Sequence, residues 1–138
     1  MDTQKIKTWL INTFGETPVA FLQAIRFAAY ISKHDPDPEV SLLPSLISGG
    51  DTVVDIGANG ANWTYWLHRQ IGNQGTLLAF EADPYYALAT DLAVKMMRLR
   101  GVRFFRFGLS DVDEKALKAL IVAAVKGRKQ KAKDSRKK

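Results

Sequence analysis

The chain has 138 residues, of which 46% are hydrophobic and none is cysteine, and its formal net charge is +6. This length suits one folded domain with a hydrophobic core, and the absence of cysteine excludes a disulfide framework and a thiolate zinc site. No apolar run reaches the roughly 20 residues that a transmembrane helix needs, and the first residues lack the apolar core of a signal peptide. We therefore expect a cytoplasmic protein without a membrane segment.

The positive charge is concentrated at the C-terminal end of the chain. Residues 1–114 hold 10 Lys/Arg and 13 Asp/Glu, whereas residues 115–138 hold 10 Lys/Arg and a single acid, Asp134. A basic extension of this kind is commonly a solvated tail, and less often it contacts nucleic acid or an acidic membrane. The charge alone leaves both interpretations open.

The first 37 residues predict a segment of two helices. The first helix follows a candidate N-cap at Thr3 and ends at Gly15, and the second follows Thr17, a candidate N-cap with proline after it, and reaches about Lys33. Apolar residues at helical spacing define the faces that we expect to be buried. They are Ile6, Trp9, Leu10 and Phe14 in the first helix and Phe21, Leu22, Ile25, Ala28 and Ala29 in the second.

Residues 38–114 predict an α/β domain in which strands and helices alternate. The predicted bounds are 34–39 for a proline-containing linker, 40–48 for a short helix, 52–56, 76–82 and 102–110 for strands, and 62–71 and 83–100 for helices. Short loops and nearly continuous apolar strands indicate parallel βαβ units. The predicted fold is therefore a partial, doubly wound parallel sheet preceded by helices, with the arginine-containing third strand at an edge.

Residues 115–138 predict a basic helix followed by a disordered end. "EKALKALIVAAVKG" (114–127) has apolar residues at helical spacing, whereas "RKQKAKDSRKK" (128–138) has no apolar pattern. Within the first crossover helix, Trp63, Tyr65 and Trp66 can stack on a base or a sugar, although their spacing favours a core stripe with Tyr65 outside it. His68 on the same helix is expected at the surface.

The stretch "VVDIGANGAN" (53–62) ends a buried strand with Asp55 and continues into a loop that contains two glycines. Gly57 and Gly60 allow the backbone to approach a ligand closely, and the first amides of the helix that follows point toward an anion. Without a ligand, the same stretch is a tight turn with a capping carboxylate. The loop taken alone leaves both interpretations open.

Polar residues follow the other two predicted strands as well. Glu81 ends the second strand, and "GLSD" places Ser110 and Asp111 at the end of the third. Because the carboxyl ends of parallel strands share one edge of the sheet, we expect these side chains on the same rim as Asp55. A carboxylate at Glu81 can accept hydrogen bonds from two ribose hydroxyls, so the shared rim favours a nucleotide-type pocket.

The sequence lacks both phosphate-binding fingerprints, G-x-G-x-x-G and G-x-x-x-x-G-K-[ST]. Asp55, two residues before the first glycine, repels a pyrophosphate but can order the loop or meet a cationic amino acid. These properties fit S-adenosylmethionine, which carries a sulfonium, an ammonium and a ribose but no phosphate.

Three segments carry a resemblance to a known family. "VVDIGANGANWT" (53–64) resembles motif I of class I S-adenosylmethionine-dependent methyltransferases, and "GTLLAFEADP" (75–84) and "VRFFRFGLSD" (102–111) resemble strand segments of its FkbM-type branch. With the lead-in "PEVSLLPSLISGGD", the similarity covers roughly residues 38–114. It implies a Rossmann-like domain that binds S-adenosylmethionine and an O-methyl transfer to the hydroxyl of a small molecule or a sugar.

The resemblance also implies roles for particular residues. It places Asp55, Gly57, Ala58, Asn59 and Gly60 along the methionine and ribose of the cofactor, Glu81 on the ribose hydroxyls with Ala82 beside it, and Ser110 and Asp111 near the adenine. The family pattern has glycine where this chain has Ala61. No catalytic residue is assigned, because the fourth-strand motif near the methyl group is absent, and no metal site is expected.

The chain departs from the family in length. The resemblance implies a seven-stranded sheet, of which this chain supplies three strands, so we expect a truncated, frameshifted or partial chain. One edge of the first strand should then be bare unless the tail helix or a partner covers it, and self-association becomes plausible. Two further hypotheses stay open: a catalytically inactive methyltransferase remnant, and association with nucleic acid through residues 126–138.

Overall fold

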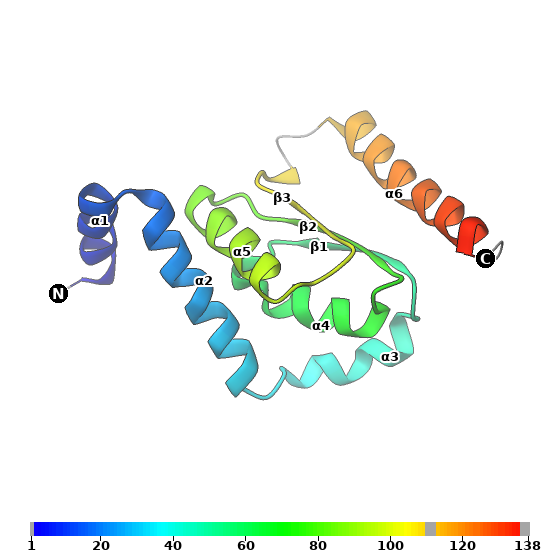
Figure 1. Ribbon diagram of the computed structural model, residues 1–138, viewed down its shortest axis with the longest axis horizontal. Helices are drawn as coiled ribbons and strands as arrows, with labels where there is room; N and C mark the ends of the chain where they lie inside the picture. Colours follow the sequence, from blue (N-terminus) through cyan, green and yellow to red (C-terminus); the bar gives the residue numbers. More distant parts are fainter. Residues whose placement is uncertain (1, 110–112, 136–138) are drawn as a thin grey trace.

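The computed structural model describes residues 2–109 and 113–135, which form an α/β fold (Figure 1). Within these residues, one sheet contains β1 (Thr52–Ile56), β2 (Thr76–Phe80) and β3 (Val102–Phe105), in the order β1-β2-β3. Both strand pairs are parallel. The predicted α/β class and its parallel βαβ units are therefore confirmed, and β3 lies at an edge of the sheet as predicted.

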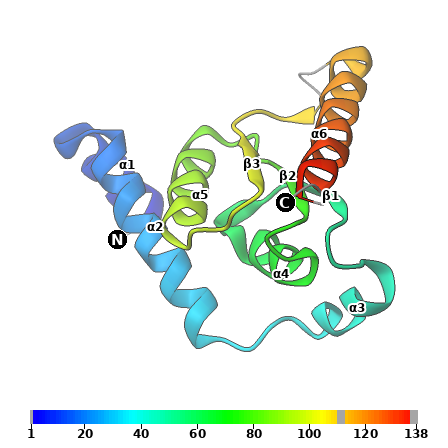
Figure 2. The same cartoon turned by 45° about the vertical axis from the view of Figure 1, so that its right-hand side comes forward.

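Helices cover both faces of the sheet (Figures 1 and 2). The crossover helices α4 (Asn62–Ile71) and α5 (Pro84–Met96) lie on one face, and α6 (Glu114–Ser135) lies on the other. Leu77 packs with residues of α4, whereas Leu78, its neighbour in β2, packs with residues of α6. Since successive side chains of a strand point to opposite faces, the apolar run of β2 is what allows helices to pack on both sides.

The N-terminal helices extend the layer on the α5 side. α2 (Glu16–Lys33) lies along α5, and α1 (Thr3–Phe14) packs on α2 away from the sheet (Figures 1 and 2). A short 3₁₀ turn, η1 (Pro38–Leu42), and α3 (Leu43–Leu46) then lead to β1. The division of the chain at residues 37 and 114 into an N-terminal segment, a core and a tail stays a prediction.

The two predicted N-caps are wrong. α1 begins at Thr3 itself, and α2 begins at Glu16 with Gly15 as its N-cap and without a side-chain cap. Gly15 has a φ of 84°, a conformation that is readily available only to glycine. The chain can therefore enter α2 at Glu16, one residue before Thr17.

The buried face of α2 also differs from the prediction. Phe21, Leu22 and Ile25 are 48%, 60% and 42% exposed, whereas Ala20 and Ala24 are fully buried. α2 is apolar over more than half of its circumference, so spacing alone cannot say which side meets α5. The close approach of the two helices selects the small residues and leaves the large ones outside. The apolar face of α1 is likewise open, since Trp9 and Phe14 are 61% and 60% exposed.

Several predicted boundaries shift in the structure. β2 ends at Phe80 rather than at residue 82, β3 ends at Phe105 rather than at residue 110, and α5 ends at Met96 rather than at residue 100. α5 begins at Pro84 rather than at residue 83, and Asp83 is its N-cap, whose side chain accepts hydrogen bonds from two backbone amides of the first turn. The strands end early because residues 81–82 and 106–109 form loops at the rim.

For residues 128–135 the prediction of a disordered end is wrong, because α6 continues to Ser135, and residues 136–138 lie outside the described residues. Lys, Arg, Gln and Ala have high helix propensity, and extending an existing helix is far easier than starting one. The apolar first half of α6 packs against the sheet through Leu117, Leu120 and Ile121. A helix that is anchored there can propagate into a basic segment that has no apolar face.

His68 and Tyr65 are more buried than predicted. His68 is only 8% exposed, and its Nε2 lies 2.8 Å from the carbonyl oxygen of Arg100. Tyr65 packs against a core cluster that joins α2, α5 and the loop after β1. Trp63 and Trp66 pack against the cluster between α4 and the sheet, as predicted. Tyr65 and His68 are covered because residues of α2 and α5 pack near the one and the α5–β3 turn lies against the other.

The outer edge of β1 is bare within the part of the chain that the structure describes, since no described strand pairs with it. α6 covers a face of the sheet but does not pair with this edge. Among the described residues, no helix is both long enough and apolar enough to cross a membrane.

Candidate functional site

The carboxyl ends of β1 and β2 bring the predicted site residues together. Phe80, the last residue of β2, accepts hydrogen bonds at its carbonyl oxygen from Gly57 N at 2.9 Å and from Ala58 N at 3.0 Å. Glu81 follows directly, and its Oε2 accepts a hydrogen bond from Asn59 N at 3.0 Å. The loop after β1 is therefore bound along its length to the end of β2.

The Glu81 carboxylate joins the two rim loops. Its Oε1 accepts a hydrogen bond from Asp83 N at 2.9 Å, while its Oε2 binds the amide of Asn59. The residue is 8% exposed. An ionised carboxylate offers about four acceptor positions, so two remain for hydroxyl groups of a ligand. Ala82, the next residue, is exposed on the same rim.

Asp55 is buried beneath the loop and orders it. The residue is 8% exposed, and its Oδ2 accepts a hydrogen bond from Thr64 Oγ1 at 2.6 Å. Burial raises the pKa of Asp55 above its ordinary value of 3.8, the Thr64 hydrogen bond opposes that rise, and the charge of Glu81 adds to it. The bond to Thr64 links the end of β1 to the first turn of α4, which is the loop-ordering role that the sequence left open.

The two glycines of the loop have different surroundings. Gly57 has a φ of 80° and nothing within 4 Å of the place where a Cβ would stand, so its outer side is open. Gly60 has a φ of 78°, its amide donates to Thr90 Oγ1 at 3.0 Å, and a Cβ there would lie 3.1 Å from the ring of Phe27. Gly57 thus leaves room for a ligand, whereas Gly60 allows α2 to approach.

Ala61 also has a positive φ, of 67°. Positions 60 and 61 therefore both have a conformation that favours glycine, and the chain has glycine at only the first of them. The side chain of Ala61 is fully buried in the cluster that contains Ile31, Val94 and Leu99. Its methyl group packs against α2 and α5 and offsets part of the backbone strain.

Three side chains that hold this loop were missed by the sequence analysis: Phe27, Thr64 and Thr90. Thr64 stands within the motif, but a threonine in the first turn of a helix gave no signal of its own. Phe27 and Thr90 come from α2 and α5, far from the loop in the sequence, and only the packing of these helices brings them near it. Ser110 and Asp111 lie outside the described residues.

A small cavity of about 350 Å³ opens between α2 and the loop after β1. Its lining combines amide, aromatic and cationic side chains: Gln23, Arg26, Phe27, Tyr30, Asn59 and Asn62, together with Gly60. Asn59 belongs both to this cavity and to the rim, because its amide binds Glu81. Among the described residues, no group of three His, Cys, Asp or Glu side chains is placed to hold a metal ion.

The chain is similar to known methyltransferases over part of its length. It is 35% identical over 89 residues to the ribosomal RNA large subunit methyltransferase E of Legionella pneumophila strain Lens, and equally to the proteins of that name from strains Corby and Paris. The match covers 62% of this chain and 41% of the relative, so the chain spans about two fifths of the length of the curated relatives that it matches. No known family profile matches the chain.

Two solved structures are also similar, each at 22% sequence identity. A SAM dependent methyltransferase from Aquifex aeolicus aligns with a TM-score of 0.42 over 57% of this chain and 46% of its own. A candidate O-methyltransferase from Klebsiella pneumoniae aligns with a TM-score of 0.46 over 77% of this chain and 50% of its own.

Proposed function

We propose that the chain provides the cofactor-binding part of an S-adenosylmethionine-dependent methyltransferase. The observation that carries this proposal is the joined rim, in which the Glu81 carboxylate at the end of β2 binds the amide of Asn59 in the glycine-containing loop after β1. The partial identity to an RNA methyltransferase supports it. Because the chain spans about two fifths of that relative, methyl transfer by the whole protein is part of the proposal.

Each rim residue has a role in this proposal. The two free acceptor positions of Glu81 receive the vicinal hydroxyls of a ribose, and the open side of Gly57 admits the sugar and the amino-acid part close to the backbone. Asp55 keeps the loop in shape through Thr64. Ala58, Asn59, Gly60 and Ala82 complete the cofactor contacts, with Ser110 and Asp111 proposed near the adenine.

Bound S-adenosylmethionine would supply a methyl group activated by the positive sulfur. The contribution of this chain is to position the cofactor and to exclude water, which is where most of the rate enhancement of such a transfer arises. The acceptor that we propose is a hydroxyl group, either on a small molecule or sugar, as the FkbM-type resemblance implies, or on RNA. The second acceptor is favoured by the relative, whose name refers to ribosomal RNA.

Calorimetric titration of S-adenosylmethionine into the purified chain tests this proposal. Glu81→Gln should weaken binding by about 10- to 100-fold, the loss expected when charge-assisted hydrogen bonds worth about 1.5–3 kcal/mol are removed. Gly57→Ala should also weaken binding, because it fills the open side of the loop. Gly72→Ala is the matched control, since Gly72 also has a positive φ and open space but ends α4 at the opposite end of the sheet.

Cooperative unfolding of each variant should be verified first, because Glu81 also satisfies two backbone amides. A chain that unfolds cooperatively but binds no cofactor would overturn the proposal and favour the inactive remnant. Equal affinities for the wild type, Glu81→Gln and Gly57→Ala would show that the cofactor binds elsewhere.

A further inference from the structure

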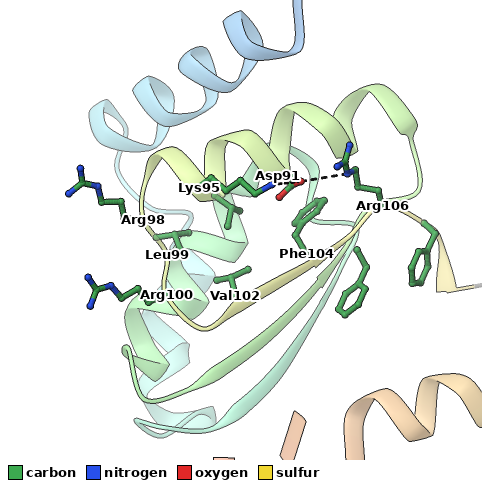
Figure 3. A pocket seen from close by; sticks show the side chains of 11 residues that line it. Asp91, Lys95, Arg98, Leu99, Arg100, Val102, Phe104 and Arg106 are labelled. Carbon is green, nitrogen blue, oxygen red and sulfur yellow. Dashed lines mark hydrogen bonds and ion pairs between the residues drawn. The ribbon is translucent and has the colours of Figure 1, made fainter. Parts of the chain in front are cut away.

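We propose that the cleft between α5 and β3 binds the backbone of a single-stranded nucleic acid. The cleft has a volume of about 770 Å³ (Figure 3). Cationic, aromatic and aliphatic side chains share its wall: Lys95, Arg98, Arg100 and Arg106; Phe104, Phe105 and Phe107; and Val94, Leu99 and Val102, with Asp91 the one acid. It is separate from the small cavity beside the loop after β1.

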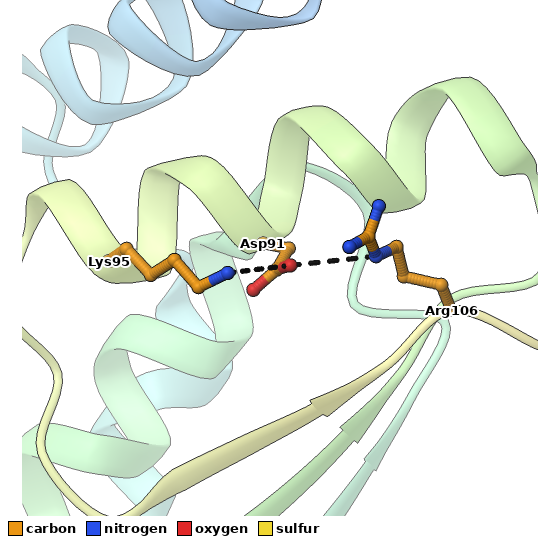
Figure 4. Close-up of polar contacts among 3 residues, drawn as sticks. All are labelled: Asp91, Lys95 and Arg106. Atoms are coloured by element: carbon orange, nitrogen blue, oxygen red, sulfur yellow. Dashed lines mark hydrogen bonds and ion pairs between the residues drawn. The ribbon is translucent and has the colours of Figure 1, made fainter. Parts of the chain in front are cut away.

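The charge of this cleft is strongly positive. Four cations, Lys95, Arg98, Arg100 and Arg106, line it against one acid, Asp91, although residues 1–114 as a whole have a net negative charge. Asp91 pairs with both Lys95 Nζ at 3.0 Å and Arg106 Nε at 3.5 Å (Figure 4), so one carboxylate serves two cations. No ion pair joins Arg98 or Arg100 to another described residue, and Figure 3 shows both side chains extending from the α5–β3 turn.

At the position of Arg98, the stability of the folded chain alone would favour a residue other than arginine. Arg98 follows Met97, the C-cap of α5, and has a φ of 54°, a left-handed conformation that is usually occupied by glycine or asparagine after a helix. A longer side chain there costs about 1 kcal/mol relative to glycine. An arginine that forms no ion pair with any described residue occupies this strained position, beside a cleft with an excess of cations.

The shape and the aromatic lining fit a single strand better than a membrane surface. The segment from Arg100 to Arg106 spans about 20 Å in extended geometry, which allows several successive phosphates to meet a cation. The cations line a hollow, with Lys95 and Arg106 beside Asp91 and with Arg98 and Arg100 at the α5–β3 turn (Figure 3). Phe104 is partly exposed on the α5 side of β3, and an aromatic ring beside a basic groove is a usual platform for an unstacked base. Phe105 and Phe107 line the edge of the cleft, while their rings pack with Phe80 toward α6.

The cleft leads toward the rim of the sheet. Phe105, in its wall, accepts a hydrogen bond at its carbonyl oxygen from Glu81 N at 3.0 Å, so the end of the cleft near Arg106 adjoins the proposed cofactor carboxylate. A strand held in the cleft could therefore present a hydroxyl group to that rim. This acceptor role rests on the proposed function, whereas binding of the strand can be measured without any cofactor.

Fluorescence anisotropy of a labelled single-stranded RNA, and of DNA with the same sequence, tests the proposal on the full chain without S-adenosylmethionine. We expect Arg98→Gly to weaken binding at least fivefold while leaving the chain as stable as the wild type or more so, because the substitution also relieves the positive φ. Arg100→Gln should weaken binding similarly. In each variant the slope of the logarithm of the binding constant against the logarithm of the salt concentration should decrease by about one, because one counterion fewer is released. Lys33→Gln, which removes a cation at the end of α2, should change binding less than twofold.

The arms of this experiment separate the alternatives. Equal binding of RNA and DNA supports recognition of the backbone charge alone, and tighter binding of RNA supports additional contacts to the 2′-hydroxyls. The proposal is overturned if neither strand binds. It is also overturned if Arg98→Gly and Arg100→Gln bind like the wild type while Lys→Gln substitutions in residues 126–138 abolish binding. Neither result would affect the cofactor titration, so failure of this inference differs from failure of the proposed function.

Discussion

The loop after β1 keeps its shape through side chains from three other elements. The Glu81 carboxylate binds the amide of Asn59, Thr90 binds the amide of Gly60, and the ring of Phe27 lies against Gly60. Each acceptor satisfies a backbone amide that would otherwise lose a hydrogen bond, at a cost of about 1–3 kcal/mol if the amide is buried. The conformation of the proposed cofactor loop thus depends on α2, on α5 and on the residue that follows β2, as well as on its own sequence.

Gly60→Ala should lower the free energy of unfolding by about 1–3 kcal/mol. The new Cβ would adopt a strained φ of 78° and lie 3.1 Å from the Phe27 ring. Urea denaturation measures the loss. In a Phe27→Leu background the substitution should cost at least about 0.5 kcal/mol less, the usual size of a coupling between contacting residues. Equal costs in both backgrounds would show that α2 does not restrict the loop.

Asp55→Asn should change how stability depends on pH. Because burial raises the pKa of Asp55 in the folded chain above 3.8, the folded state binds the proton more tightly than the unfolded state. The stability linked to this proton is present below pH 3.8 and is lost as the pH rises through the higher folded pKa. The unfolding free energy of the variant, relative to the wild type, should therefore increase from pH 4 to pH 7.

Urea unfolding at several pH values in this range measures that difference. Asp35→Asn, in the exposed linker before η1, controls for the removal of one carboxylate. A difference between the wild type and Asp55→Asn that stays constant with pH would contradict the assignment of a raised pKa to Asp55.

At the scale of elements, α6 covers the face of the sheet that α4 and α5 leave open (Figure 1). Its Leu117, Leu120 and Ile121 pack against Leu78 and Phe80 of β2. In a parallel sheet both faces are normally covered, so the face that contains Phe80 would expose a large apolar surface without this helix. We infer that the first half of α6 belongs to the core, although its composition is that of a tail.

Leu120→Ala should lower the free energy of unfolding by about 1–2 kcal/mol, somewhat less than a fully buried leucine would cost, because Leu120 is only half-buried. Val122→Ala on the exposed side of the same helix, where Val122 is 48% exposed, should change stability by no more than about 0.5 kcal/mol. Thermal or urea unfolding of the two variants distinguishes a packed α6 from one that only projects into solvent, for which both changes would be equally small.

At the scale of the whole molecule, the outer edge of β1 is a strand edge that pairs with no other described strand. Asp51 O and Gly57 N bond with β2, so the odd-numbered residues of β1 face β2. Their even-numbered neighbours Thr52, Val54 and Ile56 direct their N–H and C=O groups outward, because both groups of one residue point to the same side of a strand. Ile56 is also 66% exposed, and such an edge tends to pair with another strand.

Sedimentation velocity over a range of concentrations should therefore show self-association of the chain. Ile56→Lys should shift the chain toward the monomer, since a charged side chain on an edge strand opposes edge-to-edge pairing. Leu46→Lys is the matched control, because Leu46 is a 73% accessible leucine that belongs to the helix α3 and not to the edge strand. If both lysine variants dissociate the chain equally, general apolar contact rather than the β1 edge is responsible.

Local sequence patterns determined the order and type of the elements. The β-branched run at 52–56, the turn at 72–75 and the Asp83-Pro84 pair each specify a local conformation, and the structure has β1, the end of α4 and the start of α5 at these places. The meeting of Glu81 with the loop after β1 was predictable too, because parallel strands bring their carboxyl ends to one rim. These inferences depend on the backbone preferences of neighbouring residues and on the direction of the strands, both of which a short stretch of sequence can specify.

Only the tertiary structure decided which surfaces meet. α2 buries its alanines rather than its phenylalanine and leucine, because close packing on α5 depends on the shape of both helices. His68 becomes buried by the α5–β3 turn, and α6 becomes ordered through contacts with β2. The cleft that contains Arg98 and Arg106 likewise arises where α5 and β3 diverge. The burial of a side chain, the partners of Gly60 and the clustering of charge all depend on contacts between segments that are distant in the sequence. A periodic pattern within one segment does not say which other segment packs against it.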